Sequence, residues 1–200
     1  MLQVNPFSEI ATTLPPVFMK VFVVIMILSV LISTLLDMAH KKNAKYFFIN
    51  LKKSKDAAKR KISASKKVSV IAKTVASDIM TTAELGAGQR RIAHLLGMYG
   101  SILFWITSCI MIFNYSNPSI VTPSLFPILW HLGAIMTCLG GYWFWFFLRV
   151  DVSAEAHPWY RIIKADLFVL ALLACATFGL AWSYTQFGGQ VGLSYLFFTL

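Results

Sequence analysis

Residues 92–114 read IAHLLGMYGSILFWITSCIMIFN, and they open a run over 92–148 that contains no Asp, Glu, Lys or Arg. A second uncharged run covers 167–200, and a third lies between Lys20 and Asp37. A helix of about 20 apolar residues, rising about 1.5 Å per residue, crosses the hydrocarbon core of a bilayer. Runs of this length are too long to be covered by a polar surface in water. They therefore predict membrane-spanning helices.

The composition of the whole chain agrees with a lipid environment. Of its 200 residues 58% are hydrophobic and 13% are charged, whereas a soluble domain carries about 25% charged residues. This excludes a soluble enzyme, a disordered chain and a free nucleic-acid-binding domain. The sequence predicts an all-α fold, a polytopic integral membrane helix bundle with four full transmembrane helices and a short apolar C-terminal segment. The expected segments are an outside N-terminal segment at 1–16, transmembrane helices at 17–37, 92–114, 124–148 and 165–185, a basic cytoplasmic loop at 38–91, a second cytoplasmic loop at 149–164 and a partial apolar segment at 190–200.

The distribution of charge predicts the orientation. Residues 41–91 hold 14 of the 18 Lys and Arg residues and only three acids, so this connection carries a net charge of +11. Loops rich in Lys and Arg stay on the cytoplasmic side of a membrane. We therefore expect a multi-pass protein of the bacterial inner (cytoplasmic) membrane with its N-terminus outside.

The basic loop has two parts with different patterns. Residues 41–67 are rich in lysine, whereas 66–85 place apolar residues at helical spacing and predict an amphipathic helix. Such a helix lies on anionic lipid headgroups or forms a docking surface for a soluble partner, and the sequence leaves both interpretations open. The residues expected to dock the partner are Lys52, Lys53, Lys55, Lys59, Arg60 and Lys61.

Small residues inside the expected spans predict close helix packing. Gly133 and Gly140 lie on the third span, and Ala171, Cys175 and Gly179 repeat at intervals of four on the fourth. Small residues at this spacing let neighbouring helix backbones approach in a membrane. We assign them no chemistry.

Four histidines are the candidate cofactor ligands. His94 lies about one helical turn below the inner surface and His131 about 10 Å deep from the outer side, so roughly 20 Å separate them and they cannot share one haem iron. His40 and His157 follow the first and third spans, and they could converge with His94 at the inner side. Two imidazoles on one iron would make a b-type haem site. The alternative is that these histidines are polar residues of the membrane interface.

Other residues near the inner side fit the same chemistry. Arg90 and Arg91 could neutralise haem propionates or the developing negative charge of a quinone, or they could simply hold the loop inside. The aromatic run 142–147 could line a quinone slot or mark the membrane interface. The sequence contains no catalytic triad, paired carboxylates or phosphate-binding loop, so it predicts no hydrolytic or nucleotide chemistry.

Two stretches of the chain carry a resemblance to a known family. VIAKTVASDIMTTAEL at 70–85 and QRRIAHLLGMYG at 89–100 resemble the cytoplasmic helix and following span of the nitrate reductase gamma-subunit superfamily. The sequences LGAI at 132–135 and KADLF at 164–168 look like the same family. The resemblance covers roughly 65–185, and it is closer to the sulfur-metabolism branch, which includes the membrane anchor of adenylylsulfate reductase and the membrane subunit of a quinone-interacting oxidoreductase complex.

The resemblance implies a membrane anchor and electron-transfer subunit that links the quinone pool to a soluble cytoplasmic oxidoreductase subunit. Among the family's haem ligands His94 stands at a matching position, and haem b and quinone are the implied cofactors. The chain departs from the family where a fifth span with a histidine is expected. The short adenylylsulfate reductase anchor therefore fits better than a subunit with two haems. The alternative function is a cofactor-free structural anchor that recruits an acidic soluble partner.

Overall fold

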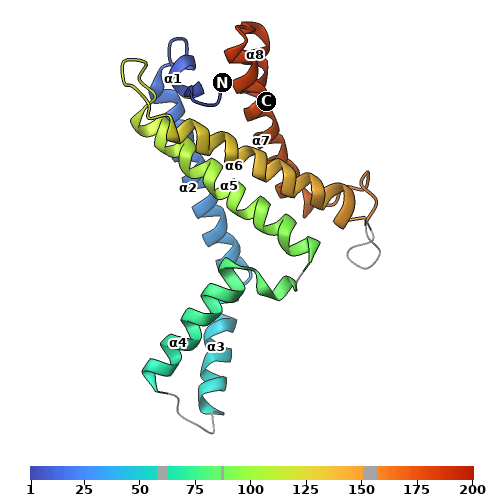
Figure 1. Ribbon diagram of the computed structural model, residues 1–200. Helices are drawn as coiled ribbons and strands as arrows, with labels where there is room; N and C mark the ends of the chain where they lie inside the picture. Colours follow the sequence, from blue (N-terminus) through green and yellow to red (C-terminus); the bar gives the residue numbers. More distant parts are fainter. Residues whose placement is uncertain (58–62, 87, 151–156) are drawn as a thin grey trace.

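The computed structural model describes residues 1–57, 63–86, 88–150 and 157–200, and every regular element in these ranges is a helix. Four helices, at 16–40, 89–114, 125–148 and 166–187, are long and apolar enough to cross a membrane. The chain is therefore a multi-pass helical membrane protein, and the predicted fold class is confirmed (Figure 1).

The elements in chain order are α1 (Pro6–Ile10), α2 (Pro16–His40), α3 (Asn43–Asp56), α4 (Ala64–Thr74), the π-helical turn η1 (Val75–Met80), the 3₁₀ turn η2 (Ala83–Leu85), α5 (Gln89–Asn114), α6 (Leu125–Trp143), the π-helical turn η3 (Phe144–Leu148), α7 (Asp166–Phe187) and α8 (Val191–Thr199).

The bundle has two distinct ends. At one end, which we call the basic end, α2 stops at His40, α5 starts at Gln89, η3 stops at Leu148 and α7 starts at Asp166. The other end, which we call the terminal end, carries α1, α8 and both chain termini (Figure 1). The two ends therefore differ in charge as well as in structure, because the lysine-rich connection leaves from the basic end.

Glycines hold α5 and α6 unusually close together. A Cβ atom on Gly133 would lie 2.6 Å from the backbone nitrogen of Phe104, and one on Gly140 would lie 2.5 Å from the carbonyl oxygen of Ala93. A Cβ on Gly100 would likewise lie 2.6 Å from the backbone nitrogen of Thr137. Since apolar surface gains nothing by leaving lipid for another helix, such close van der Waals packing stabilises the pair. The predicted packing role of Gly133 and Gly140 is confirmed.

The face of the fourth span that packs against the bundle differs from the one predicted from Ala171, Cys175 and Gly179. Ala171 and Cys175 are exposed, whereas Leu173 and Ala176 are buried. A Cβ on Gly179 would lie 3.3 Å from the Phe104 ring, so this glycine also faces the bundle. The face of α7 that turns inward therefore carries Leu173, Ala176 and Gly179.

The N-terminal segment covers the terminal end of the bundle. The Asn5 side chain donates hydrogen bonds to the Tyr115 carbonyl oxygen at 2.9 Å and to Thr122 Oγ1 at 3.0 Å. Phe7 of α1 then packs edge-on against Trp130 and Trp182, with ring centroids 6.0 and 5.3 Å apart. These contacts fix α1 as a cover over the aromatic core.

The C-terminal segment turns back along α7. Gly189 takes the left-handed backbone conformation, with φ of 70°, which glycine adopts without the strain a Cβ would cause. Phe197 of α8 then stacks on Phe178 at 6.2 Å, and Phe198 lies 5.1 Å from the Trp182 ring. The apolar segment predicted at 190–200 is thus a short helix packed against the fourth span.

The lysine-rich connection forms a helical arm that projects from the basic end (Figure 1). Lys42, with a left-handed φ of 53°, separates α2 from α3. The helix expected over 66–85 is shorter, because α4 and η1 end at Met80 and the left-handed Thr82 interrupts the chain before η2. We call α3, α4 and η1 the basic arm.

Two hydrogen bonds fasten the arm to α5. Arg91 Nε donates to the Thr81 carbonyl oxygen at 2.7 Å, and the Tyr99 hydroxyl donates to the Met80 carbonyl oxygen at 2.6 Å. The end of η1 therefore lies beside the first turns of a membrane-spanning helix.

Candidate functional site

His131 lies in the core between α6 and α7, and it is the one buried histidine of the four. Its Nδ1 lies 2.7 Å from the Pro127 carbonyl oxygen and its Nε2 lies 2.8 Å from Ser183 Oγ. Because a carbonyl oxygen only accepts, Nδ1 carries the proton, and Nε2 of the neutral ring accepts from the Ser183 hydroxyl. Both nitrogens are thus engaged, so a metal ion could bind His131 only after one of these bonds is broken.

The surroundings of His131 hold its ring in place. The Trp130 ring lies edge-on to it at 4.9 Å between centroids, and Trp130 Nε1 donates to Ser108 Oγ at 2.8 Å. Hydrogen bonds of two neighbouring residues of α6 thereby reach both adjacent spans, Trp130 to Ser108 of α5 and His131 to Ser183 of α7. The His131 cluster therefore acts as a polar connection between three spans at the level of the aromatic core.

The other three histidines lie at the basic end on three separate elements. His40 is the last residue of α2 and His94 lies in the second turn of α5, and both are exposed. His157 is half-buried and begins the described segment before α7. None of the three rings is packed into the bundle core, whereas His131 is buried in the second turn of α6, near the terminal end.

The two arginines that precede the second span differ in their contacts. Arg90 is exposed. Arg91 is half-buried, and its Nε donates to the Thr81 carbonyl oxygen. Arg91 therefore ties the arm to α5 through a bond that sequence patterns do not indicate.

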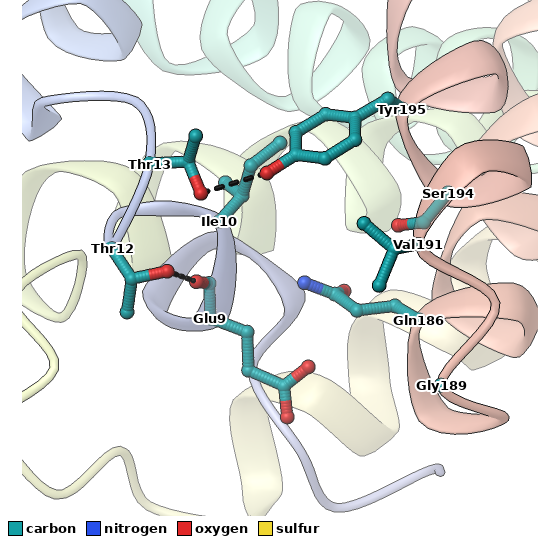
Figure 2. A pocket seen from close by; sticks show the side chains of 9 residues that line it. All are labelled: Glu9, Ile10, Thr12, Thr13, Gln186, Gly189, Val191, Ser194 and Tyr195. Atoms are coloured by element: carbon teal, nitrogen blue, oxygen red, sulfur yellow. Dashed lines mark hydrogen bonds between the residues drawn. The ribbon is translucent and has the colours of Figure 1, made fainter.

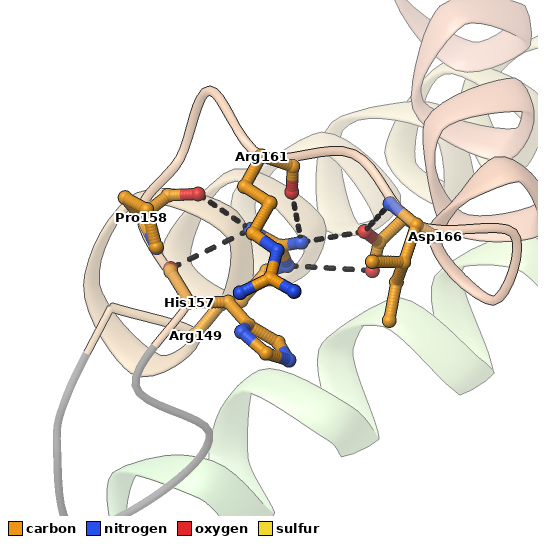
Figure 3. A network of polar contacts seen from close by, with 6 residues as sticks. Arg149, His157, Pro158, Arg161 and Asp166 are labelled. Atoms are coloured by element: carbon orange, nitrogen blue, oxygen red, sulfur yellow. Dashed lines mark hydrogen bonds and ion pairs between the residues drawn. The ribbon is translucent and has the colours of Figure 1, made fainter.

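The most buried charge lies at the basic end, between η3 and α7 (Figure 3). Arg149 is fully buried, and its Nε and Nη2 reach the two carboxylate oxygens of Asp166 at 3.3 and 2.5 Å. Its remaining N–H groups donate to the carbonyl oxygens of His157, Pro158 and Arg161. All five guanidinium N–H groups thus have acceptors, which is the condition for burying an arginine.

Two further contacts complete this cluster. The Arg149 guanidinium lies 4.4 Å from the centroid of the Trp145 ring, within range of a cation–π interaction. Asp166 also accepts a hydrogen bond from the Ile163 backbone N–H at 2.8 Å. The pair therefore joins the end of the third span to the start of the fourth. The hydrogen-bonding groups of the Arg149 guanidinium are all used within the protein, so none is left to bind a ligand.

The sequence contains one signal for this ion pair. Arg149 is the first charge after the uncharged run 92–148, and Asp166 is the last charge before the run 167–200. Opposite charges at the ends of two adjacent spans, on the same side of the membrane, are well placed to form an ion pair. Their burial depends on the path of the connecting loop, which no spacing rule supplies.

An apolar groove opens beside α6 near the basic end. It has a volume of about 440 Å³, which is within the range of small-molecule sites. The hydroxyl of Tyr142, one of its lining residues, lies 2.7 Å from Thr177 Oγ1 and so connects α6 to α7. We call it the aromatic groove, and its lining residues are Leu96, Cys138, Leu139, Tyr142, Trp143, Phe146 and Phe147.

A smaller and more polar cavity lies at the terminal end, between α1 and α8 (Figure 2). Its volume is about 190 Å³, and the Tyr195 hydroxyl donates across it to Thr13 Oγ1 at 2.7 Å. Partial burial raises the pKa of the Glu9 carboxyl beside it above the ordinary value. The cavity is smaller than most ligand sites, so we assign it no substrate.

The predicted docking residues fall into two groups. Lys52, Lys53 and Lys55 lie in the second half of α3, and all three are exposed on the arm. The other three residues, Lys59, Arg60 and Lys61, lie outside the residues that the structure describes. The described part of the site is therefore a short basic surface at the far half of α3.

A haem within this single chain does not fit the described residues. A b-type haem inside a bundle needs two inward-facing imidazoles, but His131 is already hydrogen-bonded at both nitrogens, and His40 and His94 are exposed. Apart from haem, whose iron takes two protein ligands, the described ranges contain no cluster of three or more His, Cys, Asp or Glu side chains that could hold a metal ion. We therefore route no step through a haem.

Comparison of the chain with protein-family models, with curated proteins and with solved structures found no match.

Proposed function

We propose that this chain is the membrane anchor of a cytoplasmic sulfur-cycle oxidoreductase of the adenylylsulfate reductase type, and that it links this enzyme to the quinone pool. In this proposal the protein lies in the bacterial inner membrane with the basic arm inside and the N-terminus outside. The observation that carries the proposal is the basic arm, whose exposed lysines extend from a bundle that otherwise has almost no net charge.

The charge of the arm suits the recruitment of an acidic soluble protein. Lys52, Lys53 and Lys55 lie within a single turn of α3 on different sides of the helix, and none of the three forms an ion pair in the described residues. Exposed charges of one sign steer an oppositely charged partner and fix its orientation. An enzyme held there stays next to the membrane and to its lipid-soluble electron carrier.

The aromatic groove supports the link to quinone. It is lined almost entirely by apolar and aromatic side chains, and Tyr142, whose hydroxyl lies 2.7 Å from Thr177 Oγ1, is one of its polar residues. A quinone ring needs apolar contact area and a small number of hydrogen-bonding groups. In the proposal, the groove receives the ring from the lipid near the membrane surface on which the soluble enzyme docks.

A groove variant with a matched control tests this function. The chain is purified from its native membrane in mild detergent, and we expect a soluble flavin or iron–sulfur subunit to copurify and to be reduced by quinol. Leu139→Trp should fill the groove and lower the quinol-dependent rate about tenfold, a change of about 1.4 kcal/mol. Leu132→Trp, on the same face of α6 but outside the groove, should leave the rate unchanged. The proposal would be contradicted if no flavin or iron–sulfur subunit copurified with the chain. Equal quinol-dependent rates for the two variants would also contradict it.

A second candidate function is a cofactor-free anchor that only recruits the soluble partner. The hydrogen bonds at both nitrogens of His131 and the exposure of His94 favour it. A visible spectrum of the purified complex separates the two candidates. A dithionite-reducible b-type band that is lost in His94→Ala would support a haem-bearing electron-transfer subunit, and quinol-dependent reduction without such a band would support transfer through the groove alone. The absence of both would leave the cofactor-free anchor.

A further inference from the structure

The apolar face of α4 and η1 is left uncovered by the rest of the described chain. Val68, Ile71, Val75 and Ile79 follow one another along this face and are 66, 62, 40 and 62% exposed. Their spacing of three and four residues makes a continuous stripe on one side of the helix. We call these four residues the apolar stripe. Such a stripe is unfavourable in water and requires a partner.

The charges around the stripe are mainly positive. Lys66, Lys67 and Lys73 lie off the apolar stripe and are exposed. The one acid of the segment, Asp78, is half-buried and accepts a hydrogen bond from the neighbouring Ser77 hydroxyl at 2.6 Å. An apolar stripe with lysines on the polar side is the pattern of helices that lie in the interface of an anionic membrane.

The position of the stripe agrees with a lipid surface. The carbonyl groups of Met80 and Thr81, directly after the stripe, are held by Tyr99 and Arg91 of α5. Arg91 is the last charge before the uncharged run 92–148, so this part of α5 lies where the span enters the membrane.

We propose that α4 and η1 form a surface anchor that lies on anionic lipid headgroups at the basic end of the bundle, with the apolar stripe in the interfacial layer. The fixed contact with α5 favours lipid over the groove of a soluble protein, because it holds the stripe at the membrane surface. This inference does not depend on the proposed function, since the docking lysines lie on α3. It divides the arm into a part that binds lipid and a part that binds a partner.

Fluorescent labels at two positions of α4 test the surface anchor. In a full chain whose three native cysteines are replaced by serine, Ile71→Cys places a polarity-sensitive label on the stripe and Ser69→Cys places it off the stripe. The purified protein is reconstituted in phosphatidylcholine vesicles with and without phosphatidylglycerol. With phosphatidylglycerol we expect a blue shift at position 71 and quenching by a quencher on the lipid chain, while position 69 stays water-like.

A charge variant supplies the second measurement. Replacing Lys66, Lys67 and Lys73 by glutamine should lower the ratio of lipid-bound to free arm about fivefold for each lysine removed, since each is worth about 1 kcal/mol near an anionic surface. The blue shift at position 71 should then weaken and lose most of its dependence on salt, because salt screens only the attraction between charges. A water-like label at position 71 in vesicles that contain phosphatidylglycerol would overturn the proposal. Burial of that label only after a soluble protein is added would also overturn it, and would assign the stripe to a protein groove.

Discussion

The buried ion pair of Arg149 and Asp166 organises the basic end of the bundle. Arg149 and Asp166 have side chains that are 0 and 8% exposed, and three backbone carbonyl groups of the connecting loop complete the environment of the guanidinium. The pair Lys41–Asp37 at the end of α2 has a similar N···O distance of 2.9 Å, but its side chains are 60 and 54% exposed. Water screens the second pair and not the first, so their contributions to stability differ.

Removing one partner of each pair should show this difference. We expect Asp166→Asn to lower the free energy of unfolding by about 3–5 kcal/mol, because it leaves a buried guanidinium without its counter-charge. Asp37→Asn, the matched control, should change it by about 0–1 kcal/mol. Thermal unfolding of the two variants in the same detergent is the measurement. Equal, small shifts would show that Asp166 is not needed to compensate Arg149.

The chemistry of single residues was only partly predictable from the sequence. The depth of His131 in the third span follows from its position in an uncharged run, but its partner Ser183 lies 52 residues away. Depth depends on local composition, whereas a hydrogen bond between spans depends on how two helices are rotated. The same limit applies to Arg149, whose acceptors are backbone carbonyls of a loop.

At the scale of elements, the contact between α5 and α6 is the closest in the bundle. Backbone atoms of one helix occupy the space where Gly133 and Gly140 of the other would carry a Cβ. Gly97, on the same pair of helices, has no atom within 4 Å of its ideal Cβ position. These glycines therefore differ in what surrounds them and not in their helical conformation.

Alanine substitutions should separate these two environments. Gly133→Ala forces a Cβ against the Phe104 backbone, and we expect a loss of about 1–3 kcal/mol in unfolding free energy, typical of an overpacked contact. Gly97→Ala should be neutral or stabilising by about 0.5–1 kcal/mol, because alanine favours a helix interior over glycine. Unfolding of both variants in detergent provides the comparison. A Gly97→Ala variant as unstable as Gly133→Ala would contradict this packing.

The helices themselves were largely predictable, and their ends less so. Long uncharged runs identify the four spans because no other arrangement removes so much apolar surface from water. The break at Lys42 and the turn at Thr82 both use left-handed residues that are not glycine. The left-handed conformation of these residues depends on the tertiary path of the chain, so the sequence does not predict that the helix ends there.

At the scale of the whole molecule, the bundle separates charge from apolar surface along its length. The arm and the Arg149 loop lie at one end, and α1 and α8 cover the other (Figure 1). The folding of α8 against α7 was not predictable, since a short apolar segment suits the membrane interface and a helix partner equally well. The aromatic contacts of Phe197 and Phe198 decide between them.

Single cysteines should report the orientation of the two ends. We expect Ser63→Cys, at the start of α4, to react with a membrane-impermeant reagent only from the cytoplasmic side, because the positive charge of the arm holds it there. Asn117→Cys, in the exposed turn between α5 and α6, should react only from outside. The native cysteines are first replaced, and intact cells are compared with inverted vesicles. Labelling of position 117 from the cytoplasmic side would reverse the proposed topology.

Salt-dependent release of the soluble subunit tests the central proposal, the anchor function of the arm, most directly. The native complex is bound through a tag on this chain and washed with increasing salt, in wild type and in two variants of equal charge loss. Replacing Lys52, Lys53 and Lys55 by glutamine should release the soluble subunit at clearly lower salt, because exposed charges act over about 8–10 Å and are screened by ions. The same replacement at Lys66, Lys67 and Lys73 should leave its release unchanged. Equal retention in all three proteins would contradict docking on α3, and with it the account of this chain as an anchor for a soluble enzyme.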